Sequence, residues 1–162
     1  MKNARGFTLI ELLIVVTIIA TLAVTVFVAL NPAQRLKDAK DARRTSDVDT
    51  ILTAIHVYIV DNKGSYPTGL SAGMVEKQLG TSTNPPTCVI STGGCSVAGA
   101  ADCVNLSTPL APYLKSIPVS PQSGSTTYSS TTTGYSAIVN ANGIVTIRAC
   151  GTEGSTNIES SR

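Results

Sequence analysis

Apolar residues fill almost every position from Phe7 to Leu30, and this block is the strongest pattern in the chain. As an α-helix it would be about 36 Å long, at a rise of about 1.5 Å per residue, which is enough to cross a bilayer with some tilt. The hydroxyl groups of its threonines can form hydrogen bonds to the backbone of the same helix. At Asn31-Pro32 we expect a kink or break, because Pro32 lacks an N–H and disfavours the α conformation at Asn31.

A second helical pattern runs from Ala33 to about Asp61. Charged residues crowd its first half, where Lys37 with Asp41 and Arg43 with Asp47 have the i,i+4 spacing of ion pairs. Together with Phe7–Leu30, this segment is expected to form one long helix, whose first half faces lipid or polymer. In the second half of the segment apolar residues recur at every third or fourth position, which predicts a buried stripe against a globular head. The stripe consists of Val48, Ile51, Leu52, Ile55, Tyr58 and Ile59.

The helix is predicted to stop within Asp61–Pro67, with Gly64 in a left-handed C-cap. The following region, 68–107, reads as loop, with a short helix predicted over Met74–Leu79. Two strands are predicted at Tyr135–Val139 and Ile144–Ala149, because Asn142-Gly143 between them is a hairpin signal. Their alternating apolar residues would cover the helical stripe, in a sheet of roughly three strands. The tail from Gly151 to Arg162 is predicted to be frayed.

These elements predict an α+β fold. It has a long N-terminal α-helix, membrane-spanning in its first half and amphipathic in its second, packed on a small antiparallel β-sheet head. The 162 residues carry a net charge of +2, and no basic tract points to an obligatory nucleic-acid partner. Lys2 and Arg5 precede the apolar block, so the positive-inside rule places the N-terminus in the cytoplasm and the head outside.

All four cysteines, Cys88, Cys95, Cys103 and Cys150, follow the apolar helix, where export favours disulfides. Three pairings are possible. We favour Cys88 with Cys95, which would close a short loop, and Cys103 with Cys150. A zinc site is the alternative, although no CxxC spacing is present. The one histidine, His56, lies at the edge of the apolar stripe and reads as a rim residue of the head.

Glu11 is the one charged residue inside the apolar block. A charge deep in a spanning helix costs on the order of 3 kcal/mol, so its presence indicates a function. The only small-residue junction near the basic residues, Gly6-Phe7, precedes the apolar block, whereas a secretory signal is cleaved after its apolar region. Cleavage at Gly6 would leave the helix on the mature chain. The alternative is a plain signal anchor with a stray glutamate.

The sequence Arg5-Gly6-Phe7-Thr8-Leu9-Ile10-Glu11-Leu12-Leu13 resembles the processing junction of type IV prepilins and type II secretion pseudopilins. The resemblance implies that a prepilin peptidase cuts after Gly6 and methylates the amine of Phe7. The carboxylate of Glu11 could then pair with the amine of its own chain or with that of an adjacent subunit, and the resemblance implies the pair between subunits, which sets the register of a filament. The segment Asp61–Pro67 is similar to the sequence that closes the long helix in this family, with Lys63 as an extra residue.

On this resemblance the chain has a cleaved leader (1–6), a polymerisation helix (7–30), an amphipathic helical half (31–63) and a head (64–162) with a hairpin at 135–149. It is expected to be a structural subunit of a type IV pilus-like surface filament and not an enzyme. The alternatives are a pseudopilin of a type II secretion or DNA-uptake system and a monomeric membrane-anchored adhesin. The resemblance implies a role in motility, cell adhesion or protein secretion.

The expected partners are other copies of the chain, the prepilin peptidase, an inner-membrane assembly platform and, before assembly, lipid. The chain is expected to be stored in the bacterial cytoplasmic membrane and then to reach the surface. No cofactor is expected, because the head has too few acids for a calcium site. Unlike many relatives, the apolar helix contains neither Gly nor Pro. Asn105-Leu106-Ser107 matches the short N-glycosylation acceptor pattern, and the Ser/Thr run of 123–134 offers sites for O-linked sugars.

Overall fold

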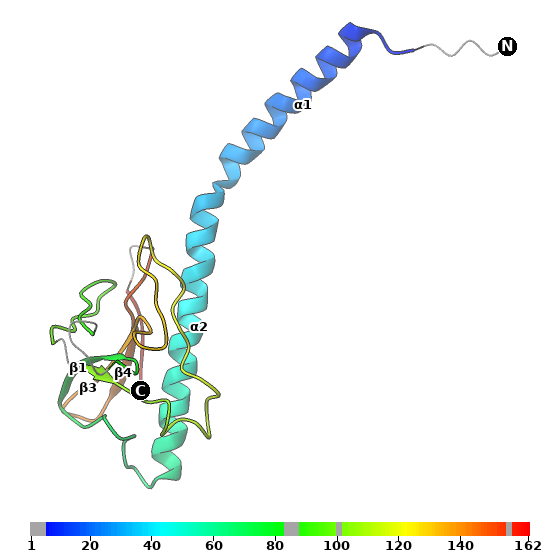
Figure 1. The fold of residues 1–162 in the computed structure, drawn as a ribbon. Helices are drawn as coiled ribbons and strands as arrows, with labels where there is room; N and C mark the ends of the chain where they lie inside the picture. The colour runs from blue at the N-terminus through cyan, green and yellow to red at the C-terminus, as the bar shows by residue number, and fades with distance from the viewer. Residues whose placement is uncertain (1–5, 83–87, 100–101, 155–156) are drawn as a thin grey trace. The chain divides into compact units, whose positions relative to one another are not determined.

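The computed structural model describes residues 6–82, 88–99, 102–154 and 157–162, so the leader residues Lys2 and Arg5 lie outside the described part. The chain divides into two compact units, Met1–Leu36 and Lys37–Arg162, and each is described here by itself. The helices and strands in chain order are α1 (Leu9–Leu30), α2 (Pro32–Asp61), β1 (Met74–Leu79), β2 (Cys103–Val104), β3 (Tyr135–Val139), β4 (Val145–Ala149) and β5 (Ile158–Ser161) (Figure 1).

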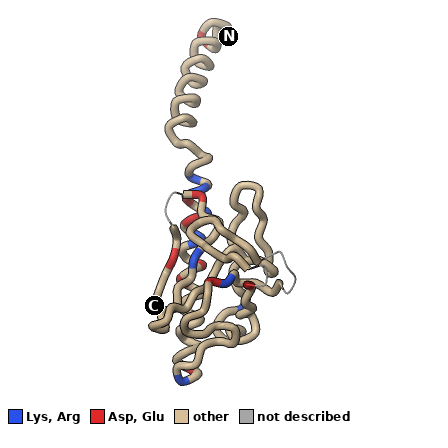
Figure 2. Tube along the Cα trace, turned by 90° about the vertical axis from the view of Figure 1, so that its left-hand side faces the viewer, with Lys and Arg blue, Asp and Glu red and all other residues tan. Residues whose placement is uncertain are grey.

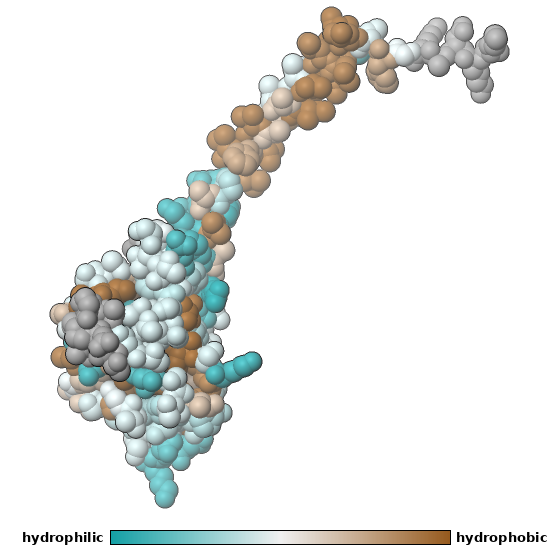
Figure 3. Space-filling view, in the orientation of Figure 1, coloured by the Kyte–Doolittle hydropathy of each residue, from teal (hydrophilic) through white to brown (hydrophobic). Residues whose placement is uncertain are grey.

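None of the residues of α1 is buried, and the face of α1 seen in Figure 3 is largely apolar. It belongs to the one helical run among the described residues, Leu9–Asp61, that is long and apolar enough to cross a membrane. Three of its threonine hydroxyls donate to the carbonyl three residues earlier, at 2.8–2.9 Å: Thr17 to Ile14, Thr21 to Ile18 and Thr25 to Leu22. The prediction that the threonine hydroxyls bond the helix backbone is therefore confirmed for these three, whereas the hydroxyl of Thr8 donates to the side chain of Glu11.

The predicted break between the two helical segments lies at Asn31. This residue has left-handed dihedral angles, φ 39° and ψ 71°, and ends α1. Its carbonyl accepts hydrogen bonds from the N–H groups of Gln34 and Arg35 at 3.0 and 3.2 Å. Pro32 then occupies the first position of α2, where a missing N–H is tolerated.

α2 ends in a Schellman motif. The N–H of Gly64 donates to the carbonyl of Ile59 at 2.8 Å, and the N–H of Lys63 donates to that of Val60 at 3.3 Å. Gly64 has φ 89°, as its predicted role in the cap requires, but Lys63 is left-handed as well, with φ 56°. The extra lysine thus occupies the position that glycine usually takes, because glycine alone adopts positive φ without steric strain.

The head contains a five-stranded mixed sheet in the order β2-β1-β3-β4-β5. β1 and β2 are parallel, and the other neighbours are antiparallel. The predicted α+β class and the β3–β4 hairpin are confirmed, with Tyr135 opposite Ala149 and Val139 opposite Val145. The sheet differs from the roughly three antiparallel strands predicted, because it has five strands and includes the parallel pair β1–β2.

Two local predictions were wrong. Residues 74–79 form strand β1 and not a helix, because they pair with β3 on one side and with β2 on the other. The tail is not frayed throughout, since Ile158–Ser161 forms β5 and pairs with β4. Both pairings join residues far apart in sequence, and this tertiary pairing overrides the weak local preference of each segment.

The core of the head lies between α2 and the sheet. The α2 residues Val48, Ile51, Leu52 and Ile55 are at most 1% exposed. They share one cluster with the inward-facing residues of the hairpin, and Tyr58 and Ile59 pack at its margin, as predicted. The hydroxyl of the fully buried Tyr135 donates to Oδ2 of Asp47 at 2.7 Å, so this large polar side chain is satisfied. Each buried aliphatic side chain contributes about 1.5–3 kcal/mol.

Candidate processing and assembly site

The residues of the predicted processing junction lie at the start of α1. Gly6 precedes the helix, and a side chain added there would meet nothing within 4 Å. The side chain of Phe7 is 91% exposed. The bond between Gly6 and Phe7 therefore lies in uncovered, non-helical backbone that a peptidase can reach.

Thr8 and Glu11 form a capping box at this end of α1. Oε2 of Glu11 accepts a hydrogen bond from the backbone N–H of Thr8 at 2.8 Å and another from its hydroxyl at 2.9 Å. In return, the N–H of Glu11 donates to the Thr8 hydroxyl at 3.3 Å. These bonds satisfy donors that the first turn of a helix otherwise leaves free. The carboxylate also lies at the positive end of the helix dipole.

The capping box changes the interpretation of Glu11. From the sequence we considered only amines as partners of its carboxylate, either the amine of Phe7 in the same chain or that of an adjacent subunit. The structure adds Thr8 as a partner within the chain. The signal was present in the sequence, because a threonine followed three residues later by a glutamate before an apolar run is the capping-box pattern.

The surface next to this site is apolar along the whole of α1. Large apolar side chains from Leu9 to Leu30 are between 50% and 81% exposed. Soluble monomeric proteins rarely expose a contiguous apolar surface of this extent to water. This surface must be covered by lipid or by protein. The site thus combines an uncovered peptide bond, one carboxylate and an uncovered apolar helix.

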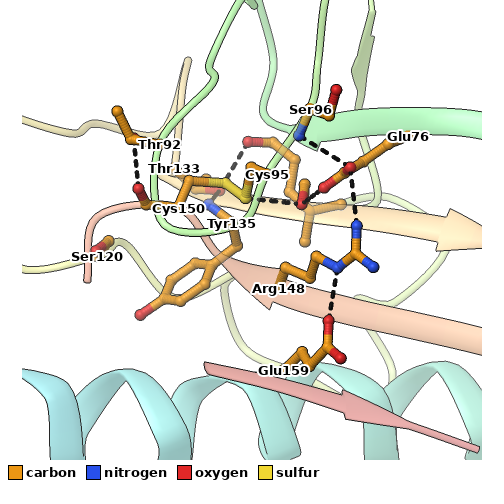
Figure 4. Close-up of a disulfide and its surroundings, with 12 residues drawn as sticks. Glu76, Thr92, Cys95, Ser96, Ser120, Thr133, Tyr135, Arg148, Cys150 and Glu159 are labelled. Atoms are coloured by element: carbon orange, nitrogen blue, oxygen red, sulfur yellow. Dashed lines mark hydrogen bonds and ion pairs between the residues drawn. A yellow bond between two sulfur atoms is a disulfide. The ribbon is translucent and has the colours of Figure 1, made fainter. Parts of the chain in front are cut away.

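The cysteines lie in the head and not at this site, and their predicted pairing was wrong. Cys88 pairs with Cys103, and Cys95 pairs with Cys150 (Figure 4). The bridge Ile90↔Val97 folds the intervening segment back on itself and places Cys95 beside the end of β4. Thr92 holds this segment by donating to the carbonyl of Cys150 at 2.5 Å. Proximity in sequence was therefore a poor guide, because the sheet brings distant cysteines together.

A buried carboxylate lies next to the Cys95–Cys150 disulfide. Oε2 of Glu76 accepts from the N–H of Ser96 at 3.0 Å and from Nη1 of Arg148 at 3.1 Å (Figure 4). Its other oxygen accepts from the hydroxyl of Ser136. Arg148 also donates to Glu159 of β5 at 2.7 Å, and this bond raises the pKa of the Arg148 guanidinium above its ordinary value. The cluster links the four strands β1, β3, β4 and β5, and each of its charges has a partner.

A second charged cluster holds the first half of α2 to the head. Arg44 is fully buried. Its guanidinium bonds Asp41 at 2.6 Å, the hydroxyl of Ser120 at 3.1 Å and the carbonyl of Pro121 at 2.9 Å. Charged residues follow this part of α2 in Figure 2. Only one of the two predicted i,i+4 pairs is seen, Arg43 with Asp47 at 3.7 Å.

The same cluster fixes the segment before β5. Oδ2 of Asp41 accepts from the N–H of Gly154 at 2.8 Å, and Lys40 pairs with Glu153 at 3.1 Å. Burial alone would raise the pKa of Glu153, but hydrogen bonds from Lys40 and the Gly124 backbone, with the charges of Lys40 and Arg44, hold that pKa below its usual value. His56 takes no part in either cluster. Its Nε2 is buried and has no partner among the described residues.

Comparison with known proteins places these features in a family. Residues 1–27 match the model of the prokaryotic N-terminal methylation motif. The chain is 35% identical over 102 residues to the type IV wide pilus major component PilA4 of Thermus thermophilus, an alignment that covers 61% of this chain and 76% of that protein. No solved structure matches the chain. The methylation motif, the uncovered apolar helix and this relationship together show that the chain belongs to the type IV pilin family and is a pilin-like filament subunit.

Proposed function

We propose that the chain is a structural subunit of a type IV pilus-like surface filament, cleaved after Gly6, methylated at Phe7 and polymerised through α1. The observation that supports this most is the position of Glu11, a single carboxylate on an uncovered apolar helix directly after the Gly6-Phe7 junction. The relative in Thermus thermophilus is the major component of a wide pilus, which favours a pilus over a secretion pseudopilus.

Glu11 acts in this proposal as a register lock. Cleavage creates a cationic amine on Phe7, and the amine of a neighbouring subunit becomes a partner for the Glu11 carboxylate. In a low-dielectric helical bundle, a misplaced subunit would leave one charge unpaired, at a cost of about 3–5 kcal/mol. In the stored subunit the bonds from Thr8 at 2.8 and 2.9 Å satisfy the carboxylate in the meantime.

The storage site and partners follow from this role. Before assembly α1 spans the cytoplasmic membrane with its N-terminus in the cytoplasm, so that lipid covers its apolar surface. The prepilin peptidase acts at Gly6-Phe7 on the cytoplasmic side. An inner-membrane platform then transfers α1 from lipid to the growing polymer, in which copies of the chain replace lipid around each helix.

Two substitutions at Glu11 test the lock. Glu11→Ala is expected to give processed, membrane-held subunits but at least about a hundredfold fewer filaments, because about 3 kcal/mol corresponds to that ratio. Glu11→Gln is the matched variant, since its amide oxygen can still accept the bonds from Thr8 but carries no charge. Filaments are counted by electron microscopy of sheared surface fractions. Normal filament numbers from Glu11→Gln would show that capping, and not charge, is what matters.

Intact mass of the purified protein separates the alternatives. Loss of residues 1–6 with one added methyl group supports the processed subunit, whereas a retained leader supports a monomeric anchored adhesin. A pseudopilin of a type II secretion or DNA-uptake system would be processed in the same way. It is distinguished by a loss of secretion or uptake, without loss of surface filaments, when the gene is deleted.

A further inference from the structure

The sequence contains a single Asn-X-Ser/Thr triplet in which X is not proline, Asn105-Leu106-Ser107. It directly follows β2. Asn105 and Ser107 are exposed, whereas Leu106 between them is 1% exposed and belongs to the core cluster. The buried leucine therefore fixes the backbone, and the two polar side chains are presented to solvent at a defined place.

The two polar side chains bond each other. Oδ1 of Asn105 accepts hydrogen bonds from the N–H of Ser107 at 3.0 Å and from its hydroxyl at 2.6 Å. The Nδ2 group of Asn105 has no partner within the described part of the chain. Donors to Oδ1 polarise the amide and make its N–H protons more acidic. The serine at the third position thus prepares the free amide nitrogen for reaction.

A recessed cavity of about 170 Å³ has both Asn105 and Ser107 in its wall, and most of that wall is apolar. Other residues of its wall, Thr81, Ser116 and Ser130, supply hydroxyl groups, and Lys115 supplies an ammonium group. Hydroxyl and ammonium groups are the donors and acceptors that the hydroxyls of a sugar require. A saccharide attached to Asn105 would therefore have hydrogen-bonding groups beside it, in a hollow whose wall is otherwise mostly apolar.

We propose that Asn105 is a modification site that carries an N-linked saccharide, an inference that depends on the proposed function only in requiring that the head is exported. The donor class is a saccharide linked through its anomeric carbon to a lipid pyrophosphate. Nδ2 of Asn105 bonds to that carbon as the carbon–oxygen bond to the pyrophosphate breaks. The lipid pyrophosphate leaves with the electron pair, and a carboxylate of the transferase takes one amide proton.

One tryptic peptide tests the inference. Cleavage after Lys77 and Lys115 releases residues 78–115, in which Asn105 is the one residue that fits the pattern, since Asn84 precedes a proline. The chain is isolated from the cells that naturally produce it, reduced, digested and analysed by mass spectrometry with fragmentation. We expect this peptide to carry at least one monosaccharide unit, located on Asn105. An unmodified mass for the whole population overturns the proposal.

Matched variants separate the acceptor from its neighbours. Asn105→Gln and Ser107→Ala are expected to lose the added mass completely, whereas Ser107→Thr keeps the hydroxyl and the modification. An added mass that persists in Asn105→Gln would place the sugar on a serine or threonine and overturn the proposal. Filaments are examined in the same samples, so normal filaments with an unmodified peptide would refute this inference while leaving the proposed function intact.

Discussion

The buried Arg44 allows a quantitative test of what holds α2 to the head. Arg44→Ala removes a fully buried guanidinium with bonds to Asp41, Ser120 and Pro121. The change leaves a cavity and deprives Asp41 of its cationic partner. Breaking a buried ion pair by removing one member costs about 3–5 kcal/mol, so we expect a loss of that size in the free energy of unfolding.

The adjacent residue provides the control. Arg43 pairs with Asp47 at 3.7 Å, but its side chain is 63% exposed. Exposed ion pairs contribute about 0–1 kcal/mol, so Arg43→Ala should unfold almost like the unchanged chain. The two substitutions remove the same side chain from neighbouring positions of one helix and thus differ mainly in burial.

Urea unfolding of the mature chain in detergent measures both changes. The chain contains no tryptophan, and its five tyrosines, Tyr58, Tyr66, Tyr113, Tyr128 and Tyr135, all lie in the second unit. Tyrosine fluorescence therefore reports the unfolding of the head and not of α1. If Arg44→Ala and Arg43→Ala differ by less than about 1 kcal/mol, the ion pair is not a main support of the head.

Three further changes test other parts of the structure. Lys63→Gly should stabilise the head by up to about 1 kcal/mol in the same urea assay, because glycine adopts the left-handed conformation at φ 56° without strain, whereas Lys63→Ala should change the stability little. A destabilised glycine variant would contradict the assigned cap. Loss of the Cys95–Cys150 disulfide should lower the free energy of unfolding by about 1 kcal/mol more than loss of Cys88–Cys103, because the sequence separations are 55 and 15 residues and a longer loop has more entropy when unfolded. Replacing each cysteine pair by two serines measures both losses, and equal losses or the reverse order would refute the prediction. The pKa of Glu153 is lowered in the folded chain, so its ion pair with Lys40 stabilises the fold fully above the unfolded glutamate pKa of about 4.3, and this contribution disappears as the pH falls through the lower folded pKa. Acid should therefore destabilise the unchanged chain more steeply than Glu153→Gln. Parallel profiles of unfolding free energy against pH would show that the pair contributes nothing.

The parts of the fold that could be predicted from sequence are those with short-range signals. The stripe around Ile51 and Ile55 follows from helical spacing, and the β3–β4 hairpin follows from Asn142-Gly143. The break at Asn31 follows from proline sterics. In each case the residues that determine the structure lie close to it in the sequence.

Long-range pairing accounts for what the sequence did not reveal. β1 and β5 are strands because β3 and β4 lie beside them, and the disulfides follow from that arrangement. In the sequence, Arg44 is one of many charged residues in this part of α2, and nothing local marks it as buried. It is buried because the distant loop at Ser120 and Pro121 packs against it. At the candidate site the junction and Glu11 were found from their spacing. The role of Thr8 was missed, although its pattern is local.

The threonine bonds within α1 have a consequence for the way in which such helices can meet. The hydroxyl protons of Thr17, Thr21 and Thr25 are already donated to the helix's own carbonyls. In a polymer built through α1, these groups would have no proton left to donate to a neighbouring helix, so the contacts along the span would be almost purely dispersive. Dispersive contacts have little directionality, and one helix could slide or rotate against another over low barriers. Along the span, only the pairing of the Glu11 carboxylate would then fix the axial position of one helix relative to its neighbours.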